Sequence, residues 1–218
     1  ALPIYYEKQI LLKDTQYRAL QAQINPHFLY NTLNSINWMI RSGKNEEASE
    51  MLISLGDLLR AAFKKEQLAT VLEELELARH YIDIQKVRYR RRAEFLMEAE
   101  GDLEAYHVPR MILQPLVENS INHGVDNSLN KCRILVRVKE NVEAQTMTLE
   151  VEDDGPGMTE EELEAVRNFT MVPKGNGIGL KNIRERLNLI FSDAVFEITS
   201  QPGKGTVVRI EIPKYGGK

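Results

Sequence analysis

The chain has 218 residues, 43% of them hydrophobic and 28% charged, which is the composition of a globular protein with core enough for one large domain or two ordinary ones. Its net charge of −4 gives no reason to expect a nucleic-acid partner. The single cysteine, Cys132, excludes an internal disulfide and a cysteine-based metal site, and it fits a reducing cytosol.

The sequence also bears on the cellular location. No apolar stretch approaches the roughly 20 residues that cross a bilayer, and no signal peptide is visible. Because the chain begins without Met, we expect a cytoplasmic piece of a longer protein, whose membrane segments would lie elsewhere.

The first part of the chain, from Ile10 to about Tyr89, has the apolar spacing of helices. Further helices are predicted from Leu33 to Lys65 and from Glu73 onward, with a break at 42–45 and no strand before Tyr89. A short coiled-coil-like seam opens the region, formed by Ile10, Tyr17, Leu20, Ile24 and His27.

A basic run follows, and the pattern then changes. Arg88, Arg90, Arg91 and Arg92 mark either a solvated helix end or a docking or lipid surface. Beyond them, strands are predicted at 95–100, 134–138, 147–151, 196–198 and 207–212, the last two joined by a hairpin at 203–205. Helices are predicted at 109–123, after the capping pair Thr159 and Glu162, and at 180–190.

These elements predict an α+β protein in two regions. Residues 1–92 would form a helical region, and residues 93–218 an α/β sandwich with helices on one face of a mixed sheet. The boundary is expected near residue 92.

Asp153 is the clearest candidate for chemistry. Strand alternation puts Met147, Leu149, Val151 and Asp153 on one face, so an acid ends an apolar stripe. A buried carboxylate needs hydrogen bonds, and the glycines in Gly155-Pro156-Gly157 permit a ligand to approach the backbone closely. The exocyclic amine of adenine would satisfy both features. An ordinary Asp-rich turn that caps the next helix is the alternative.

A second candidate lies on the helix predicted at 109–123. Ile112, Leu116, Asn119 and His123 share one face, so the apolar stripe becomes polar near its end. The Asn119 amide oxygen suits Mg²⁺, which usually bridges substrate phosphates. Glu118 and Asn122 form a neighbouring pair that could address the same phosphates. Alternatively, these residues only satisfy a helix end stopped by Gly124.

Two further clusters are weaker alone. The run from Gly175 to Leu180 precedes an amphipathic helix and could close over phosphate, or could be a flexible loop. It lacks the dinucleotide fingerprint and the P-loop order.

His27 follows Asn25-Pro26, and Asn31 lies one helical turn on, within reach to fix the imidazole tautomer. A lone helical histidine is more often structural.

Taken in order, the clusters resemble a known family. Asn25 to Asn34 (NPHFLYNTLN) is similar to the phosphoacceptor box of LytS/YesM-type sensor histidine kinases. Leu116 to Gly124 (LVENSINHG) resembles the N box of the GHKL ATPase superfamily, to which these kinases belong. Asp153 to Gly157, Gly175 to Leu180 and Gly203 to Thr206 resemble its glycine boxes. The resemblance covers residues 15 to 212, nearly the whole chain.

The resemblance implies specific roles. His27 would accept the γ-phosphoryl group of ATP, with Asn31 and Glu118 as catalytic neighbours, and Asn119 would hold Mg²⁺. Asp153 would bind the adenine amine. The other expected nucleotide-binding residues are Asn122, His123, Gly155, Gly157, Gly175, Gly177, Gly179, Leu180 and Thr206.

The resemblance also implies partners. These are a second copy of the chain in a parallel homodimer through the helices, an upstream membrane-bound sensor, and a response regulator whose Asp receives the phosphoryl group. Trp38-Met39 and residues 81–85 favour the YesM-like branch, whose regulators are often AraC-type transcription factors.

Two departures from the family pattern stand out. Asn122 replaces an expected Lys, so a phosphate contact would lose a charge. Phe28 follows the histidine where many histidine kinases have an acid that acts as a base, which leaves Asn31 or solvent to handle the proton. Phosphoryl transfer depends mostly on positioning and charge neutralisation, so a strong base is not essential.

Three other functions compete with this interpretation. A pseudokinase would bind ATP without transfer, which His27, Asn119 and Asp153 argue against. A gyrase-type ATPase would need a catalytic Glu where Pro115 stands. A serine/threonine kinase of the anti-sigma type would lack the helical histidine region.

Overall fold

The computed structural model describes residues 26–64, 66–168 and 177–214. The chain divides into two compact units, residues 1–65 and residues 66–218. Of the predicted coiled-coil-like seam, the members up to Ile24 lie outside the described residues, and only His27 lies within them.

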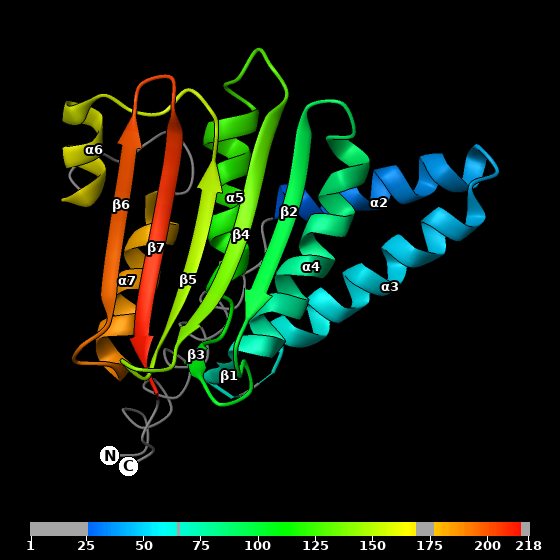
Figure 1. The fold of residues 1–218 in the computed structure, drawn as a ribbon. Helices are drawn as coiled ribbons and strands as arrows, with labels where there is room; N and C mark the ends of the chain where they lie inside the picture. The colour runs from blue at the N-terminus through cyan, green and yellow to red at the C-terminus, as the bar shows by residue number, and fades with distance from the viewer. Residues whose placement is uncertain (1–25, 65, 169–176, 215–218) are drawn as a thin grey trace, which may run out of the picture. The chain divides into compact units, whose positions relative to one another are not determined.

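The described part of the first unit is a pair of helices. Helix α2 spans Pro26–Arg41 and helix α3 spans Asn45–Ala62, and the two pack against each other (Figure 1). The turn between them falls at Ser42–Lys44, where the sequence predicts a break. Proline at the start of α2 is favourable, because the first N–H groups of a helix have no partner within it.

The second unit combines helices with two sheets. Its elements in chain order are β1 (Leu68–Thr70), α4 (Val71–Arg88), β2 (Ala93–Glu100), β3 (His107–Pro109), α5 (Leu113–Ser120), the single π-helical turn η1 (Ile121–Val125), β4 (Cys132–Asn141), β5 (Thr146–Asp153), α6 (Glu160–Arg167), α7 (Gly177–Ile190), β6 (Val195–Gln201) and β7 (Gly205–Pro213).

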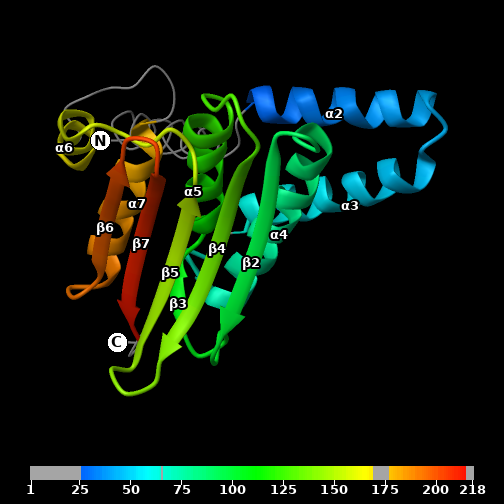
Figure 2. The same ribbon diagram turned by 45° about the horizontal axis from the view of Figure 1, so that its top comes forward.

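The main sheet is mixed and five-stranded. Its strand order is β2-β4-β5-β7-β6, in which β2 and β4 are parallel and every other pair is antiparallel. Helices α4, α5 and α7 lie on one face of it, as Figures 1 and 2 show from two directions. This confirms the predicted fold of helices on one face of a mixed sheet.

The core lies between that sheet and those helices. Alternation along β5 buries Met147, Leu149 and Val151 on the helix side. The opposite face of the sheet carries ion pairs between neighbouring strands, such as Arg137 with Glu98 and Glu150. Because one face is apolar and the other carries charges, the register of each strand is fixed: a shift by one residue would turn its apolar side chains away from the core.

Two predictions about elements are wrong. Strand β1 precedes Tyr89, in a region where no strand is predicted; it has three residues, too few to show alternation, and it exists because it pairs with β3. Pro109 ends β3 instead of starting a helix. The residues directly after Pro109 are not helical, since Met111 has φ +57°, and α5 begins only at Leu113.

The boundary between compact units differs from the one expected near residue 92. Helix α4 belongs to the second unit, where it packs on α5 and β2, so the units meet at residue 65. The assignment of separate functions to 1–92 and 93–218 stays a prediction.

Candidate functional site

Asp153 lies where strand β5 ends. The alternation that buries Val151 also buries the carboxylate, which is 4% exposed. It accepts a hydrogen bond from the Gly155 amide at 3.1 Å, and the Ser120 hydroxyl and the Thr206 amide also donate to it. Burial raises its pKa to about 6, although these three donors favour the ionised form.

The turn after β5 packs against the end of the helix that carries Asn119. A Cβ atom on Gly155 would lie 2.5 Å from the Gly124 Cα, and one on Gly124 would lie 2.9 Å from the Asp153 Oδ1. Only glycine fits at either position. The first glycine box and the N box therefore meet, backbone to backbone, beside the buried carboxylate.

The hairpin between β6 and β7 closes the other side of Asp153. A Cβ atom on Gly205 would lie 1.8 Å from the Asp153 carbonyl oxygen, and one on Gly157 would lie 1.9 Å from the Gln201 carbonyl oxygen. The buried Thr206 lies 3.0 Å, hydroxyl to hydroxyl, from Ser200. The hairpin turn predicted at 203–205 is confirmed, and it packs against the Asp153 backbone.

The N-box residues lie on α5 and its π-helical extension. Asn119 is partly buried, as is Asn122, whereas His123 lies nearer the surface. Desolvation lowers the pKa of the His123 ring. The helix, predicted to end at His123, continues to Val125 as a π turn, a distortion often found at functional sites.

Glu118 is partly buried on the same helix. Burial raises the pKa of Tyr81 on α4, and the charge of Glu118 raises it further. This interaction places Glu118 close to Tyr81. Its predicted catalytic role stays a prediction.

The second glycine box is described in part. Gly175 lies outside the described residues, whereas Gly177 begins α7 and Gly179 lies in its first turn. A Cβ atom on Gly179 would meet nothing within 4 Å, so packing alone does not require glycine there. Leu180 is buried in the core. The predicted succession of a glycine run and an amphipathic helix is confirmed from Gly177 onward.

His27 lies on α2 with its ring exposed. The Asn31 amide nitrogen is 3.3 Å from both the Nδ1 and the Nε2 of the ring, so the two side chains are neighbours as the spacing predicts. Phe28, the next residue, is buried. His27 belongs to the first unit, and Asp153 belongs to the second.

Two residues beside Asp153 were not singled out in the sequence. Ser120 donates to its carboxylate, and Ser200 accepts from the Met158 amide at 2.9 Å while it donates to the Gly205 carbonyl at 2.8 Å. Ser120 could have been found, since it lies one helical turn after Leu116 on the buried side of α5. Ser200 has no such signal.

The sequence matches two known families along its length. Residues 15–93 match the histidine kinase family, and residues 107–216 match the family of histidine kinase-, DNA gyrase B- and HSP90-like ATPases. The chain belongs to the histidine kinases. The second match contains Asp153 and all the residues packed around it.

Named relatives fall in the same group. Sensor histidine kinase YesM of Bacillus subtilis is 41% identical over 209 residues, which are 95% of this chain and 35% of that protein. Sensor protein LytS of Bacillus anthracis is 34% identical over 212 residues, 95% of this chain and 36% of that protein. The chain therefore spans about a third of the length of the relatives it matches.

Solved structures agree on the fold. The histidine kinase domain of the blue-light activated histidine kinase from Erythrobacter litoralis EL346 is 19% identical, with a TM-score of 0.52 over 92% of this chain and 94% of that one.

The donor set near Asn119 fits a magnesium ion only when phosphate is present. Within the described ranges, no group of three or more His, Cys, Asp or Glu side chains could hold a metal ion. Mg²⁺, however, is commonly bound by one or two protein oxygens together with water and substrate phosphates. The Asn119 amide oxygen is a suitable single ligand of that kind.

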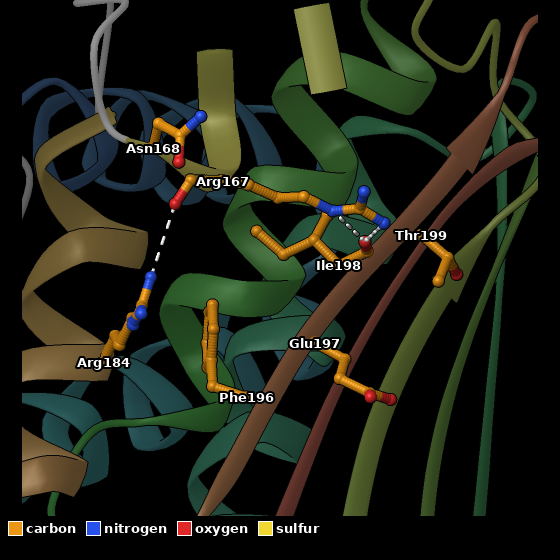
Figure 3. A pocket seen from close by; sticks show the side chains of 7 residues that line it. All are labelled: Arg167, Asn168, Arg184, Phe196, Glu197, Ile198 and Thr199. Atoms are coloured by element: carbon orange, nitrogen blue, oxygen red, sulfur yellow. Dashed lines mark hydrogen bonds between the residues drawn. The ribbon is translucent and has the colours of Figure 1, made fainter. Parts of the chain in front are cut away.

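A cavity of about 460 Å³ lies at the edge of the sheet between α6, α7 and β6 (Figure 3). In it, Arg167 donates to the Ile198 carbonyl at 2.8 and 3.1 Å, and Arg184 donates to the Arg167 carbonyl at 3.3 Å. Both guanidinium groups thus already have backbone partners. The cavity contains no predicted site residue; its lining is Arg167, Asn168, Arg184, Phe196, Glu197, Ile198 and Thr199.

A separate property concerns membranes. Among the helices of the described residues, none has the length and apolarity to cross a bilayer.

Proposed function

We propose that this histidine kinase chain binds ATP at Asp153, transfers the γ-phosphoryl group to His27, and passes it on to an aspartate of a response regulator. One observation carries the proposal: a buried carboxylate at the end of β5 is enclosed by glycine backbone from three separate motifs. Such an acid is costly to bury unless a ligand or the protein donates hydrogen bonds to it.

The arrangement supports adenine recognition at Asp153. The ionised carboxylate already accepts from Gly155, Ser120 and Thr206, and it has lone pairs left for the exocyclic amine of adenine. Asn119 and Asn122 lie on the adjoining helix close to Ser120 and Gly124 in the sequence, where they would address the phosphates and, through Asn119, Mg²⁺. A bound magnesium ion would neutralise phosphate charge.

The chemistry at His27 is a direct transfer. A ring nitrogen of neutral imidazole forms a bond to the γ-phosphorus as the bond between that phosphorus and the β,γ-bridging oxygen breaks, and ADP leaves with the electron pair. The N–H proton of the ring passes to solvent. Asn31, 3.3 Å from the ring, would orient the imidazole.

A labelling experiment tests the proposal. Incubation with [γ-³²P]ATP is expected to label the wild-type chain with an acid-labile, alkali-stable phosphoryl group. His27→Gln should lose the label, and Asp153→Asn should lose nucleotide binding. His80→Gln, which alters a histidine on α4, is the matched control and should keep the label. Full labelling of His27→Gln would refute the proposal.

We further propose the partners that the family implies. The exposed apolar side chains of α2 and α3 support a homodimer through these helices. The names of the relatives support an upstream sensor, which would lie in the membrane with this portion on the cytoplasmic side. Resemblance to the YesM-like branch supports an AraC-type regulator. Transfer of label from the phosphorylated chain to purified candidate regulators would test this last point.

A further inference from the structure

Glu74 is a buried acid on α4 that the proposed mechanism does not use. Its side chain is 1% exposed. The carboxylate accepts hydrogen bonds from the Met111 amide at 2.6 Å, the Ile112 amide at 2.7 Å and the Leu113 amide at 3.3 Å. The first two are as short as charge-assisted hydrogen bonds, and the three amides favour the ionised form, whereas burial raises the pKa of this carboxyl.

These three amides begin helix α5. The residue before the helix, Ile112, offers no side-chain cap, and Met111 has φ +57°, which is unfavourable for a residue with a side chain. Glu74 therefore caps α5 from another helix and places a negative charge at its positive end. The far end of the same helix carries Asn119 and Ser120.

Arg186 links α7 to this point. Its guanidinium donates to the carbonyl oxygen of Arg110, the residue just before the capped amides. The charges of Arg186 and Glu74 also interact: burial lowers the pKa of Arg186, and Glu74 opposes that shift. Arg110 is itself fixed, since its side chain donates to the carbonyls of Glu66 and Leu68.

Two helices of the proposed nucleotide site thus share one anchor. Helix α5 carries Asn119 and Ser120, and α7 begins with Gly177 and Gly179. Neither Glu74 nor Arg186 belongs to a motif of the site. Both nevertheless act on the backbone where those two helices approach each other.

We propose that Glu74 and Arg186 are positioning residues for ATP, which hold the N-terminal end of α7 in register with the N box so that both can address the same phosphates. This rests on the proposed nucleotide site. Glu74 and Arg186 act from two different helices on the same stretch of backbone, residues 110–113, which leads directly into the helix that carries Asn119.

Calorimetric titration of the intact chain with Mg-ATP tests the pair. Arg186→Met keeps the aliphatic stem but removes the charge and the hydrogen bond to Arg110. We expect the Kd for ATP to rise about tenfold, the size expected for one lost charge-assisted interaction, with one site per chain retained. Arg209→Met, on the opposite face of the sheet, is the matched control and should bind as the wild type does.

The binding stoichiometry separates positioning from structure. If the pair only stabilised the fold, Arg186→Met would lower the number of sites per chain and leave the Kd of the folded molecules unchanged. That result, or a Kd within about twofold of wild type at full stoichiometry, overturns the proposal.

Two further variants keep the test decisive. Arg186→Lys preserves the charge with one compact donor group, so we expect it to recover most of the affinity that Arg186→Met loses. If Arg186→Met does not fold, Arg186→Gln, which also removes the charge, replaces it, and a wild-type Kd for that variant counts against the proposal. Glu74→Gln combined with Arg186→Met should cost less than the sum of the two single changes. Additive effects on Kd contradict coupling.

The same ATP titration distinguishes a failure of the proposed nucleotide site from a failure of the proposed positioning role. Wild type that binds ATP while Asp153→Asn does not supports the nucleotide site independently of Arg186. Wild type without saturable binding overturns both the proposed site and this inference.

Discussion

At the scale of single residues, Asp153 combines two requirements that oppose each other. The proposed recognition of an adenine amine needs an ionised carboxylate, and burial disfavours that form. Its folded pKa of about 6 lies above the ordinary value of 3.8. The native state therefore holds a proton between these pH values that the unfolded chain releases, so this group's contribution to stability is lost as pH rises through 6.

The substitution Asp153→Asn should consequently keep or increase the stability of the fold while it abolishes the binding of ATP. The shift of Asp153 corresponds to a cost on the order of 3 kcal/mol at pH 7, an upper bound because the donors nearby relax around either form. We expect Asp153→Asn to raise the free energy of unfolding in urea by up to about 2 kcal/mol at pH 7, and by about half as much at pH 5. A variant less stable than wild type at pH 7 would contradict this.

The same titration predicts how ATP affinity depends on pH. A protonated Asp153 has one oxygen occupied by its proton and loses its negative charge, so it is a weaker acceptor for the adenine amine. We expect the affinity for ATP to be constant above pH 7 and to fall as pH decreases through about 6. Measurements between pH 5 and 8 in constant ionic strength check this, and affinity that stays level down to pH 5 would refute it.

Glycine is required at Gly205 for space as well as for backbone conformation. Gly203 and Gly205 both have positive φ, at +74° and +88°, but only at Gly205 would a Cβ atom meet another backbone, 1.8 Å from the Asp153 carbonyl oxygen. We expect Gly203→Ala to cost about 1 kcal/mol through conformational strain alone. Gly205→Ala should cost at least about 3 kcal/mol and lower ATP affinity, because Asp153 must move.

Thermal and urea unfolding of the two alanine variants would measure this difference. Equal losses at the two positions would show that strain, and not the contact with Asp153, explains the glycine at 205.

At the scale of elements, the sequence predicts what depends on neighbours along the chain. Strand alternation correctly places Asp153 on the buried face of β5, and the spacing of Thr159 and Glu162 correctly predicts a capping box. The cap of α5 was not predicted, since Glu74 and the amides that it accepts from are 37 to 39 residues apart. The strand β1 was missed for the same reason: the strand that it pairs with, β3, lies far along the chain.

The structure has a second capping box, at Thr70 and Glu73, with hydrogen bonds of 3.1 and 3.2 Å at the start of α4. Its loss should affect the whole unit, because α4 buries nine residues, whereas α6 buries only Leu163. We expect Thr70→Ala to lower the free energy of unfolding by about 1 kcal/mol. Thr159→Ala should fray α6 locally and change global unfolding by less than about half as much.

Urea unfolding measures the global change, and hydrogen exchange of α6 amides measures the local one. Equal global losses for the two threonines would show that α6 unfolds together with the core.

At the scale of the whole molecule, the two compact units predict where the chain can be divided. A fragment of residues 66–218 keeps β1, α4 and every described residue around Asp153, so it should unfold cooperatively and bind ATP within about twofold of the intact chain. This fragment should not take up labelled phosphate from ATP, because it lacks His27. A fragment of residues 93–218 loses Glu74, leaves three amides of α5 without their acceptor and uncovers the side of α5 that packs on α4.

We therefore expect the shorter fragment to show no cooperative transition. Circular dichroism during heating, with ATP titration of both fragments, compares them. Equal stability would place the structural boundary near residue 92, where the composition changes.

The proposed homodimer can be followed through Trp38, the only tryptophan in the chain. Trp38 is 60% exposed, and further exposed apolar side chains lie on α2, on α3 and, for Phe63, directly after α3: Tyr30, Leu33, Ile40, Leu52, Ile53 and Phe63. An apolar surface of this kind on two paired helices marks an interaction site. If a second copy covers it, Trp38 fluorescence should shift to shorter wavelength as protein concentration rises, in parallel with the mass measured by sedimentation.

Charge on that surface should prevent the shift. Burial of a leucine contributes about 1.5 to 3 kcal/mol, so Leu33→Lys should weaken the dimer at least about tenfold and keep Trp38 emission at the long-wavelength limit. Leu189→Lys is the matched control: Leu189 is 85% exposed on α7, away from these helices in the chain, and its substitution should leave both measurements unchanged. Emission that does not depend on concentration in wild type, with the mass of one chain, would exclude a dimer through α2 and α3, and phosphorylation of His27 would then have to occur within a single chain.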